Sequence, residues 1–159
     1  MLRMNRFAIF ASTLLIAALV LSVAATADQH SGTWKMNPTK SKYSPGPTPK
    51  DVTVKVDSDG NGVRIDADGT NADGTASHVE YSAKFDGKNY PIIGTYADTV
   101  SVERIDANTM QSTLRKKDGQ LMMTVITTIS ADGKTRTSTF KGKDGQGREV
   151  NNVVVYDKQ

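Results

Sequence analysis

Residues 76–87 read Ala-Ser-His-Val-Glu-Tyr-Ser-Ala-Lys-Phe-Asp-Gly and show the pattern that recurs along most of this chain. Their apolar members alternate with polar residues: Val79, Tyr81, Ala83 and Phe85. An alternation with a period of two places one set of side chains on a buried sheet face and the other set in water. The final Asp86-Gly87 is a residue pair that tight hairpin turns favour. The stretch therefore predicts a half-buried β-strand followed by a hairpin.

The same combination of strand and turn repeats on both sides of this stretch. Asp-Gly occurs seven times, at 59–60, 68–69, 73–74, 86–87, 118–119, 132–133 and 144–145. Runs rich in Val, Ile, Thr and Tyr predict ten strands, at residues 32–36, 52–57, 63–67, 76–85, 89–93, 99–105, 110–116, 121–130, 135–142 and 149–157. No window shows the periodicity of an amphipathic helix.

Strands joined by short turns form an antiparallel up-and-down meander. An open meander leaves two edges free to pair with other chains, and closure into a barrel removes both edges. We therefore expect an all-β fold in which roughly eight to ten strands close into a calycin-like barrel. Closure requires the strand that contains Trp34 to pair with the strand that contains Tyr156.

The first 27 residues differ from the rest of the chain. Arg3 and Arg6 precede an apolar run, residues 8–23, and the small residues Ala-Thr-Ala follow at 25–27. This order is typical of a secretory signal peptide. The run is also shorter than the roughly 20 residues that a membrane-spanning helix needs. We expect a signal peptide over residues 1–27, one domain over residues 28–159 with no membrane span after cleavage, and a periplasmic or secreted location.

Composition and charge argue against several classes of function. The chain has 20 basic and 17 acidic residues, and two of the basic residues lie in the expected signal peptide. A nucleic-acid-binding protein would show a much stronger basic excess. The absence of cysteine excludes disulfides, thiolate catalysis and thiolate metal sites. The chain also lacks a Gly-x-Ser-x-Gly elbow, a phosphate loop and a dinucleotide fingerprint. We therefore expect no nucleic-acid partner, no enzymatic activity and no cofactor.

One connection breaks the regular spacing of turns. Residues 37–51 contain four of the five prolines: Pro38, Pro45, Pro47 and Pro49. Proline lacks the backbone donor that a sheet ladder needs. We expect an extended crossing outside the sheet that passes over one end of the barrel.

Residues at the two ends of the domain suggest a family. Ser31-Gly32-Thr33-Trp34-Lys35-Met36, with Ser41-Lys42-Tyr43 after it, resembles the Gly-x-Trp start of the calycin group, which includes lipocalins and intracellular fatty-acid-binding proteins. Asp132-Gly133-Lys134 and the final Val155-Tyr156-Asp157-Lys158 are similar to the end of fatty-acid-binding proteins. The body also resembles small exported, lipocalin-like bacterial proteins, in which segments such as Asp86-Gly87-Lys88-Asn89-Tyr90-Pro91 and Val150-Asn151-Asn152-Val153 recur.

The resemblance implies an antiparallel barrel with a pocket for a small apolar molecule. It also implies that Trp34 plugs one end of the barrel. The chain departs from fatty-acid-binding proteins at the carboxylate clamp, because Val154 stands where those proteins have an Arg two residues before the terminal Tyr. The proline-rich crossing also replaces the helical pair of those proteins. These departures favour a neutral or amphipathic ligand, or no ligand, over a fatty acid held by that clamp.

Alternation within the predicted strands selects candidates for the ligand-contacting interior. We expect a ligand to contact Tyr81, Phe85, Ile92, Val102, Leu114, Met123, Val125, Phe140 and Tyr156. In residues 135–140 the pattern leaves two faces open. Either Thr135, Thr137 and Thr139 point inward, or Arg136, Ser138 and Phe140 do. An inward Arg136 would restore a means of binding an acid.

Three further features could be functional sites, but we favour a structural explanation for each. Residues 57–62 match the start of an EF-hand calcium loop, but Arg64 and Asp68 do not fit positions eight and twelve, and a hairpin also selects these residue types. His78 and Glu80 share a strand face and predict an exposed polar pair, so we expect no metal site. Residues 121–126 are apolar on both faces, which predicts cover from the proline-rich crossing or, alternatively, a dimer interface.

These observations predict a non-enzymatic exported binding module that holds a small apolar or amphipathic molecule inside a β-barrel. The alternative is a structural or protein-interaction domain of the cell envelope with a packed core and no ligand. In either case we expect a monomer or a weak homodimer.

Overall fold

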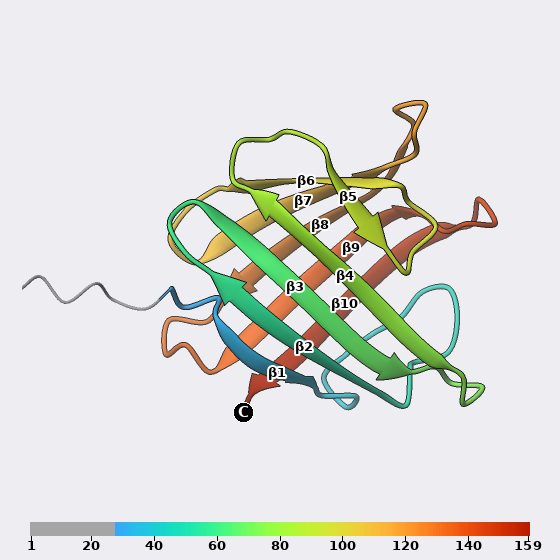
Figure 1. Cartoon of the computed structure of the whole chain (residues 1–159). Helices are drawn as coiled ribbons and strands as arrows, with labels where there is room; N and C mark the ends of the chain where they lie inside the picture. Colours follow the sequence, from blue (N-terminus) through green and yellow to red (C-terminus); the bar gives the residue numbers. More distant parts are fainter. Residues whose placement is uncertain (1–27) are drawn as a thin grey trace, which may run out of the picture.

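The alternating segments form one antiparallel sheet that closes on itself (Figure 1). A computed structural model describes residues 28–159, and the predicted signal peptide lies outside the described residues. The strands are β1 (Gly32–Met36), β2 (Asp51–Ser58), β3 (Gly62–Thr70), β4 (Ala76–Lys84), β5 (Tyr90–Ile93), β6 (Thr99–Arg104), β7 (Thr109–Arg115), β8 (Leu121–Ile129), β9 (Thr135–Lys143) and β10 (Glu149–Lys158). Each corresponds to one predicted strand.

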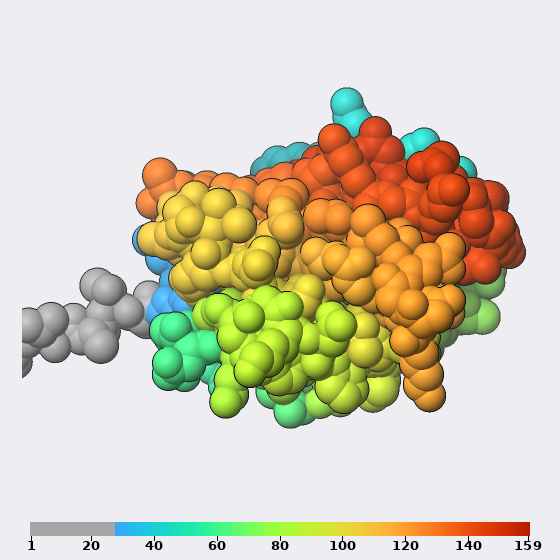
Figure 2. Space-filling model, turned by 90° about the horizontal axis from the view of Figure 1, so that it is seen from above, coloured from blue at the N-terminus to red at the C-terminus, as the bar shows by residue number. Residues whose placement is uncertain are grey.

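Each strand pairs with the next one in sequence, and β10 pairs with β1 to close the ring. At the closure Trp34 lies opposite Lys158, and Met36 lies opposite Tyr156. This register confirms the predicted all-β, up-and-down closed barrel. Figure 2 shows the meander from above, where neighbouring surface segments follow sequence order from green through yellow and orange to red. Residues 28–159 contain no helix that could span a bilayer.

The up-and-down order gives the barrel two different ends. The turns after β2, β4, β6 and β8 lie at the end where the chain enters from residue 28, and we call this the closed end. The turns after β3, β7 and β9 lie at the opposite end, which we call the mouth (Figure 1). The largest fully buried side chains include Trp34, His30, Val102 and Ile129. His30 precedes β1 at the closed end, and Val102 and Ile129 lie in the closed-end halves of β6 and β8.

Polar contacts fix the N-terminal residues against the closed end. The indole Nε1 of Trp34 donates a hydrogen bond of 2.9 Å to the carbonyl oxygen of His30. The carboxylate of Asp28 accepts a hydrogen bond of 2.8 Å from Ser58 Oγ and forms an ion pair with Arg104. Trp34 is therefore a core residue at this end.

The proline-rich crossing was expected to lie wholly outside the sheet, and this prediction is wrong for its middle. Lys42 and Val153 exchange backbone hydrogen bonds of 2.7 and 2.8 Å, and the amide of Asn151 donates to the carbonyl of Ser44 at 2.7 Å. The physical reason is the mismatch in strand length, because β1 has five residues and β10 has ten. Backbone groups of β10 beyond the reach of β1 are satisfied by the crossing.

The crossing pairs with β10, and β9 separates β10 from β8, which contains residues 121–126. A register shift explains the apolar pair on β8, since Leu114 lies opposite Met123 while the next residue, Arg115, lies opposite Leu121. Met122 is thus the extra residue of a bulge, and both it and Met123 are buried. Leu121, by contrast, is 52% exposed.

Candidate functional site: a cavity inside the barrel

The inward-facing side chains leave a cavity of about 330 Å³ that extends from Arg136 and Tyr156, toward the closed end, to Val52 and Val79, toward the mouth. Its lining comes from β2, β3, β4, β5, β7, β8, β9 and β10 and from the loop after β5. The apolar members of the lining are Val52, Val54, Ile65, Ala67, Val79, Ile92, Leu114, Met123, Val125 and Phe140, together with the rings of Tyr81, Tyr96 and Tyr156. The barrel therefore contains both a packed closed end and an unfilled chamber.

Seven of the nine predicted ligand-contacting residues line this cavity: Tyr81, Ile92, Leu114, Met123, Val125, Phe140 and Tyr156. The other two, Val102 and Phe85, do not. Val102 is fully buried near the closed end, and Phe85 packs beneath the guanidinium of Arg104, 4.7 Å from the ring centroid. Alternation predicts that a side chain points inward, but it does not predict how far along the barrel axis the packed core extends.

The structure settles the orientation of β9. Arg136 and Ser138 are buried, and both line the cavity with Phe140. The threonines of the same strand belong to the opposite face. The inward set is therefore the alternative that contains Arg136, which would restore a group able to bind an acid. Arg136 lies on β9, and the neighbouring strand β10 carries Val154 and Tyr156.

Sequence reasoning missed further polar residues of the lining, among them Ser112 and Thr127, whereas Ser138 belonged to one of the two alternatives left open for β9. Thr127 and Ser138 lie opposite each other on β8 and β9, and their hydroxyl oxygens are 2.9 Å apart. A signal was available, because Ser112 lies two residues before Leu114 and Thr127 lies two residues after Val125. The same parity that selected the apolar residues would have selected these.

Arg136 is the only basic residue that lines the cavity. Its Nε and Nη1 atoms have no hydrogen-bond partner among the described residues. Burial lowers the pKa of Arg136, and burial raises the pKa of Tyr156 to about 12. Since an arginine stays protonated in proteins, the cavity holds a positive charge beside a neutral tyrosine.

His30 lies below this region at the closed end and is fully buried. Neither of its ring nitrogens has a hydrogen-bond partner among residues 28–159. Burial, with a smaller contribution from the positive charge of Arg136, lowers the pKa of His30 to about 4. The imidazole is therefore neutral at neutral pH.

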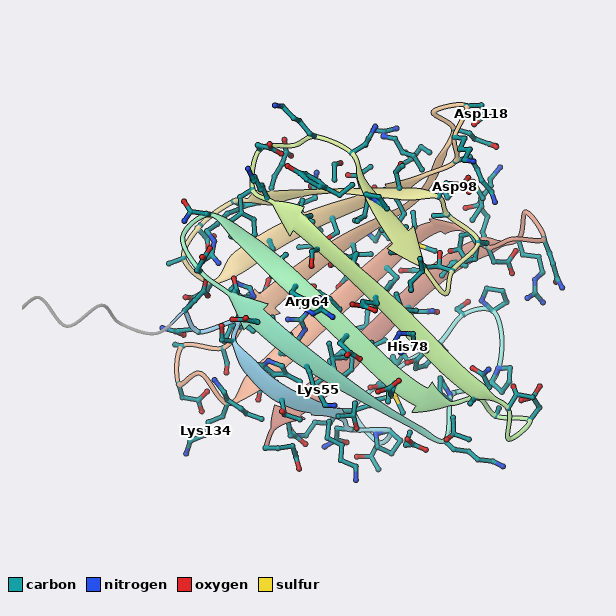
Figure 3. The ribbon with its side chains drawn as sticks, in the orientation of Figure 1. Lys55, Arg64, His78, Asp98, Asp118 and Lys134 are labelled. Atoms are coloured by element: carbon teal, nitrogen blue, oxygen red, sulfur yellow. The ribbon has the colours of Figure 1, made fainter. Side chains whose placement is uncertain are left out.

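The second histidine lies on the outer surface, where Figure 3 shows His78 on β4 and Arg64 on β3. His78 Nδ1 is 2.8 Å from Asp68 Oδ1, and Nε2 is 3.8 Å from Glu80 Oε2. The predicted polar pair thus exists, with Asp68 as the nearest partner. Potential ligand atoms of Asp66, Asp68 and His78 lie within 4.8 Å of one another and could contribute to a metal site. Asp68 and His78 are exposed and lie 2.8 Å apart as a polar pair, while Asp66 is partly buried.

The turn that resembles a calcium loop is a hairpin between β2 and β3. Asp59 Oδ1 accepts hydrogen bonds from the backbone amides of Asn61 and Gly62 at 2.7 and 2.9 Å. These bonds account for Asp59 in this turn, because its carboxylate satisfies two backbone amides.

In comparisons with known proteins, no family model matches this chain, and no curated protein matches it either.

Proposed function

We propose that the protein is a non-enzymatic, exported binding module that holds a small amphipathic molecule inside its barrel. The observation that carries this proposal is the cavity of about 330 Å³. Protein interiors are close-packed and contain few voids larger than a water molecule, which occupies about 30 Å³ in the liquid. The cavity lies instead at the lower end of the size range of ligand pockets, roughly 300 to 1,000 Å³.

The distribution of side chains supports an amphipathic occupant. Val52, Ala67 and Val79 lie in the mouth-side halves of their strands and give apolar walls. Arg136 and Tyr156 lie toward the closed end, so the deepest part of the cavity is polar. A molecule with an apolar body and one polar group would satisfy both regions.

Native mass spectrometry of the exported protein, isolated without detergent, tests this function. We expect the protein ion to carry a bound small molecule and to release it on collisional activation in the mass spectrometer. The variant Ala67→Phe places a ring inside the cavity and should abolish the bound mass. Ser82→Phe adds the same ring to an exposed outer position of β4 and should leave the bound mass unchanged.

If the wild-type protein carries no molecule and binds no apolar or amphipathic probe, the container function is wrong. The alternative, an envelope domain that acts through its outer surface, would then gain support from a partner or a dimer in solution.

A further inference from the structure

The cavity holds a cation without a counter-ion. No carboxylate lies within 4.0 Å of Arg136 among residues 28–159, whereas Arg64, Arg104 and Arg148 all form ion pairs with carboxylates. Arg136 is also only 6% exposed, so its charge lies inside the barrel. A buried charge without a partner is unfavourable, and proteins normally pair such a charge or neutralise it.

The groups packed around Arg136 do not supply a negative charge. The neighbouring titratable groups that act on it are the phenols of Tyr81 and Tyr156, and burial raises the pKa of both, so both remain neutral. His30, on the closed-end side, is neutral as well. Asp68, the one carboxylate-bearing residue of the lining, lies late in β3 toward the mouth and pairs with His78. The deep part of the cavity is thus electropositive.

We infer that the ligand is a small amphipathic acid whose carboxylate binds the guanidinium of Arg136 at the bottom of the cavity. This inference rests on the proposed function. A guanidinium offers a carboxylate two parallel donors, either Nη1 with Nη2 or Nε with Nη2. In Arg136, neither Nε nor Nη1 has a hydrogen-bond partner among residues 28–159.

A second donor is available beside the arginine. In the pair formed by Thr127 and Ser138, one hydroxyl donates to the other, which leaves one hydroxyl proton free. Ser138 is two residues from Arg136 on the same face of β9. The apolar part of the acid then extends toward the mouth along Leu114 and Phe140.

Calorimetric titration with decanoate and decanol, which share a chain and differ in head group, tests the inference. Wild-type protein should bind decanoate more tightly than decanol. Arg136→Met should weaken decanoate binding by at least about tenfold, which corresponds to about 1.4 kcal/mol, and should leave decanol binding unchanged or stronger. Lys141→Met removes a positive charge from an outward position of the same strand and should change neither affinity.

The outcomes separate the two proposals. If both probes bind the wild type and Arg136→Met affects them equally, the acid specificity is wrong while the container function stands. If neither probe binds, the container function itself fails. If Arg136→Met does not fold, a measurement on the wild-type protein still tests the inference. The NMR signal of Arg136 Nε–H should shift when decanoate is added and should not shift when decanol is added. If decanoate binds without shifting this signal, the inference is wrong.

Discussion

Arg136 and Tyr156 lie directly opposite each other on β9 and β10, and both side chains enter the barrel. The arginine is charged, and the tyrosine keeps its proton because burial raises its pKa to about 12. The pair is therefore a cation beside a neutral hydroxyl. Such an arrangement leaves a buried charge uncompensated, which is unfavourable.

The empty barrel should gain stability when this charge is removed. Replacing buried charged groups with apolar residues of similar size often stabilises proteins by about 1 to 4 kcal/mol. We expect Arg136→Met to raise the free energy of unfolding of ligand-free protein by an amount in this range, measured by urea denaturation. Lys141→Met, on the outer face, should change it by less than about 0.5 kcal/mol. A destabilised Arg136→Met barrel would show that the guanidinium is satisfied in solution.

Trp34→Phe should destabilise the closed end. The substitution removes the indole donor and leaves the carbonyl oxygen of His30 buried without its partner. An unsatisfied buried acceptor costs about 1 to 3 kcal/mol, and the lost ring volume adds to this. The loss is measurable by urea denaturation followed by circular dichroism, since Trp34 is the only tryptophan. Ile105→Ala, at a position 57% exposed, is the control and should have little effect.

Gly94 permits the loop after β5 to approach β4. Its φ is +80°, and a Cβ at this position would overlap the carbonyl oxygen of His78. We expect Gly94→Ala to destabilise the barrel by more than about 3 kcal/mol. Gly119 has a φ of +87° with no described atom within 4 Å of its Cβ position, so Gly119→Ala should cost only about 1 kcal/mol. If both variants lose the same free energy of unfolding, the positive φ alone, and not overlap with the backbone of His78, determines the destabilisation.

Buried His30 should make the protein less stable in acid. Its pKa is about 4 in the folded protein and about 6.5 in the unfolded chain, so the unfolded chain gains a proton first as the pH falls. Stability should therefore decrease by up to about 1.4 kcal/mol per pH unit between these values. The difference in urea stability between wild type and His30→Asn, measured against pH, isolates this dependence. A pH-independent difference would contradict the assigned burial.

His78 should act in the opposite direction. Its hydrogen bond with Asp68 raises its pKa above 6.5, despite partial desolvation, so the ion pair contributes fully below that pH. The contribution is lost as the pH rises through the raised pKa. In the variant His30→Asn, His78 is the only histidine, and NMR titration of its ring should give a pKa above 6.5. Asp68→Asn in the same background should lower that pKa.

The prediction of fold succeeded because its signals are local. A period of two in the side chains and Asp-Gly at the turns act within a few residues, and ten strands with short turns leave closure as the way to remove both edges. The crossing at residues 42–44 escaped prediction because its pairing depends on β10 being longer than β1, a relationship between segments about 110 residues apart.

The candidate site was predictable only in part. Sequence parity identified Tyr81 and Leu114 as inward residues. On β9 it could not decide between the threonines and the set Arg136, Ser138 and Phe140, because neither set is clearly apolar. The amino-acid pattern by itself established the strands, the turns and most of the inward set, since these follow from local backbone geometry. The three-dimensional arrangement alone established the orientation of Arg136, the lack of a counter-ion for it within residues 28–159, and the unfilled volume beside it, because packing and charge pairing depend on all ten strands at once.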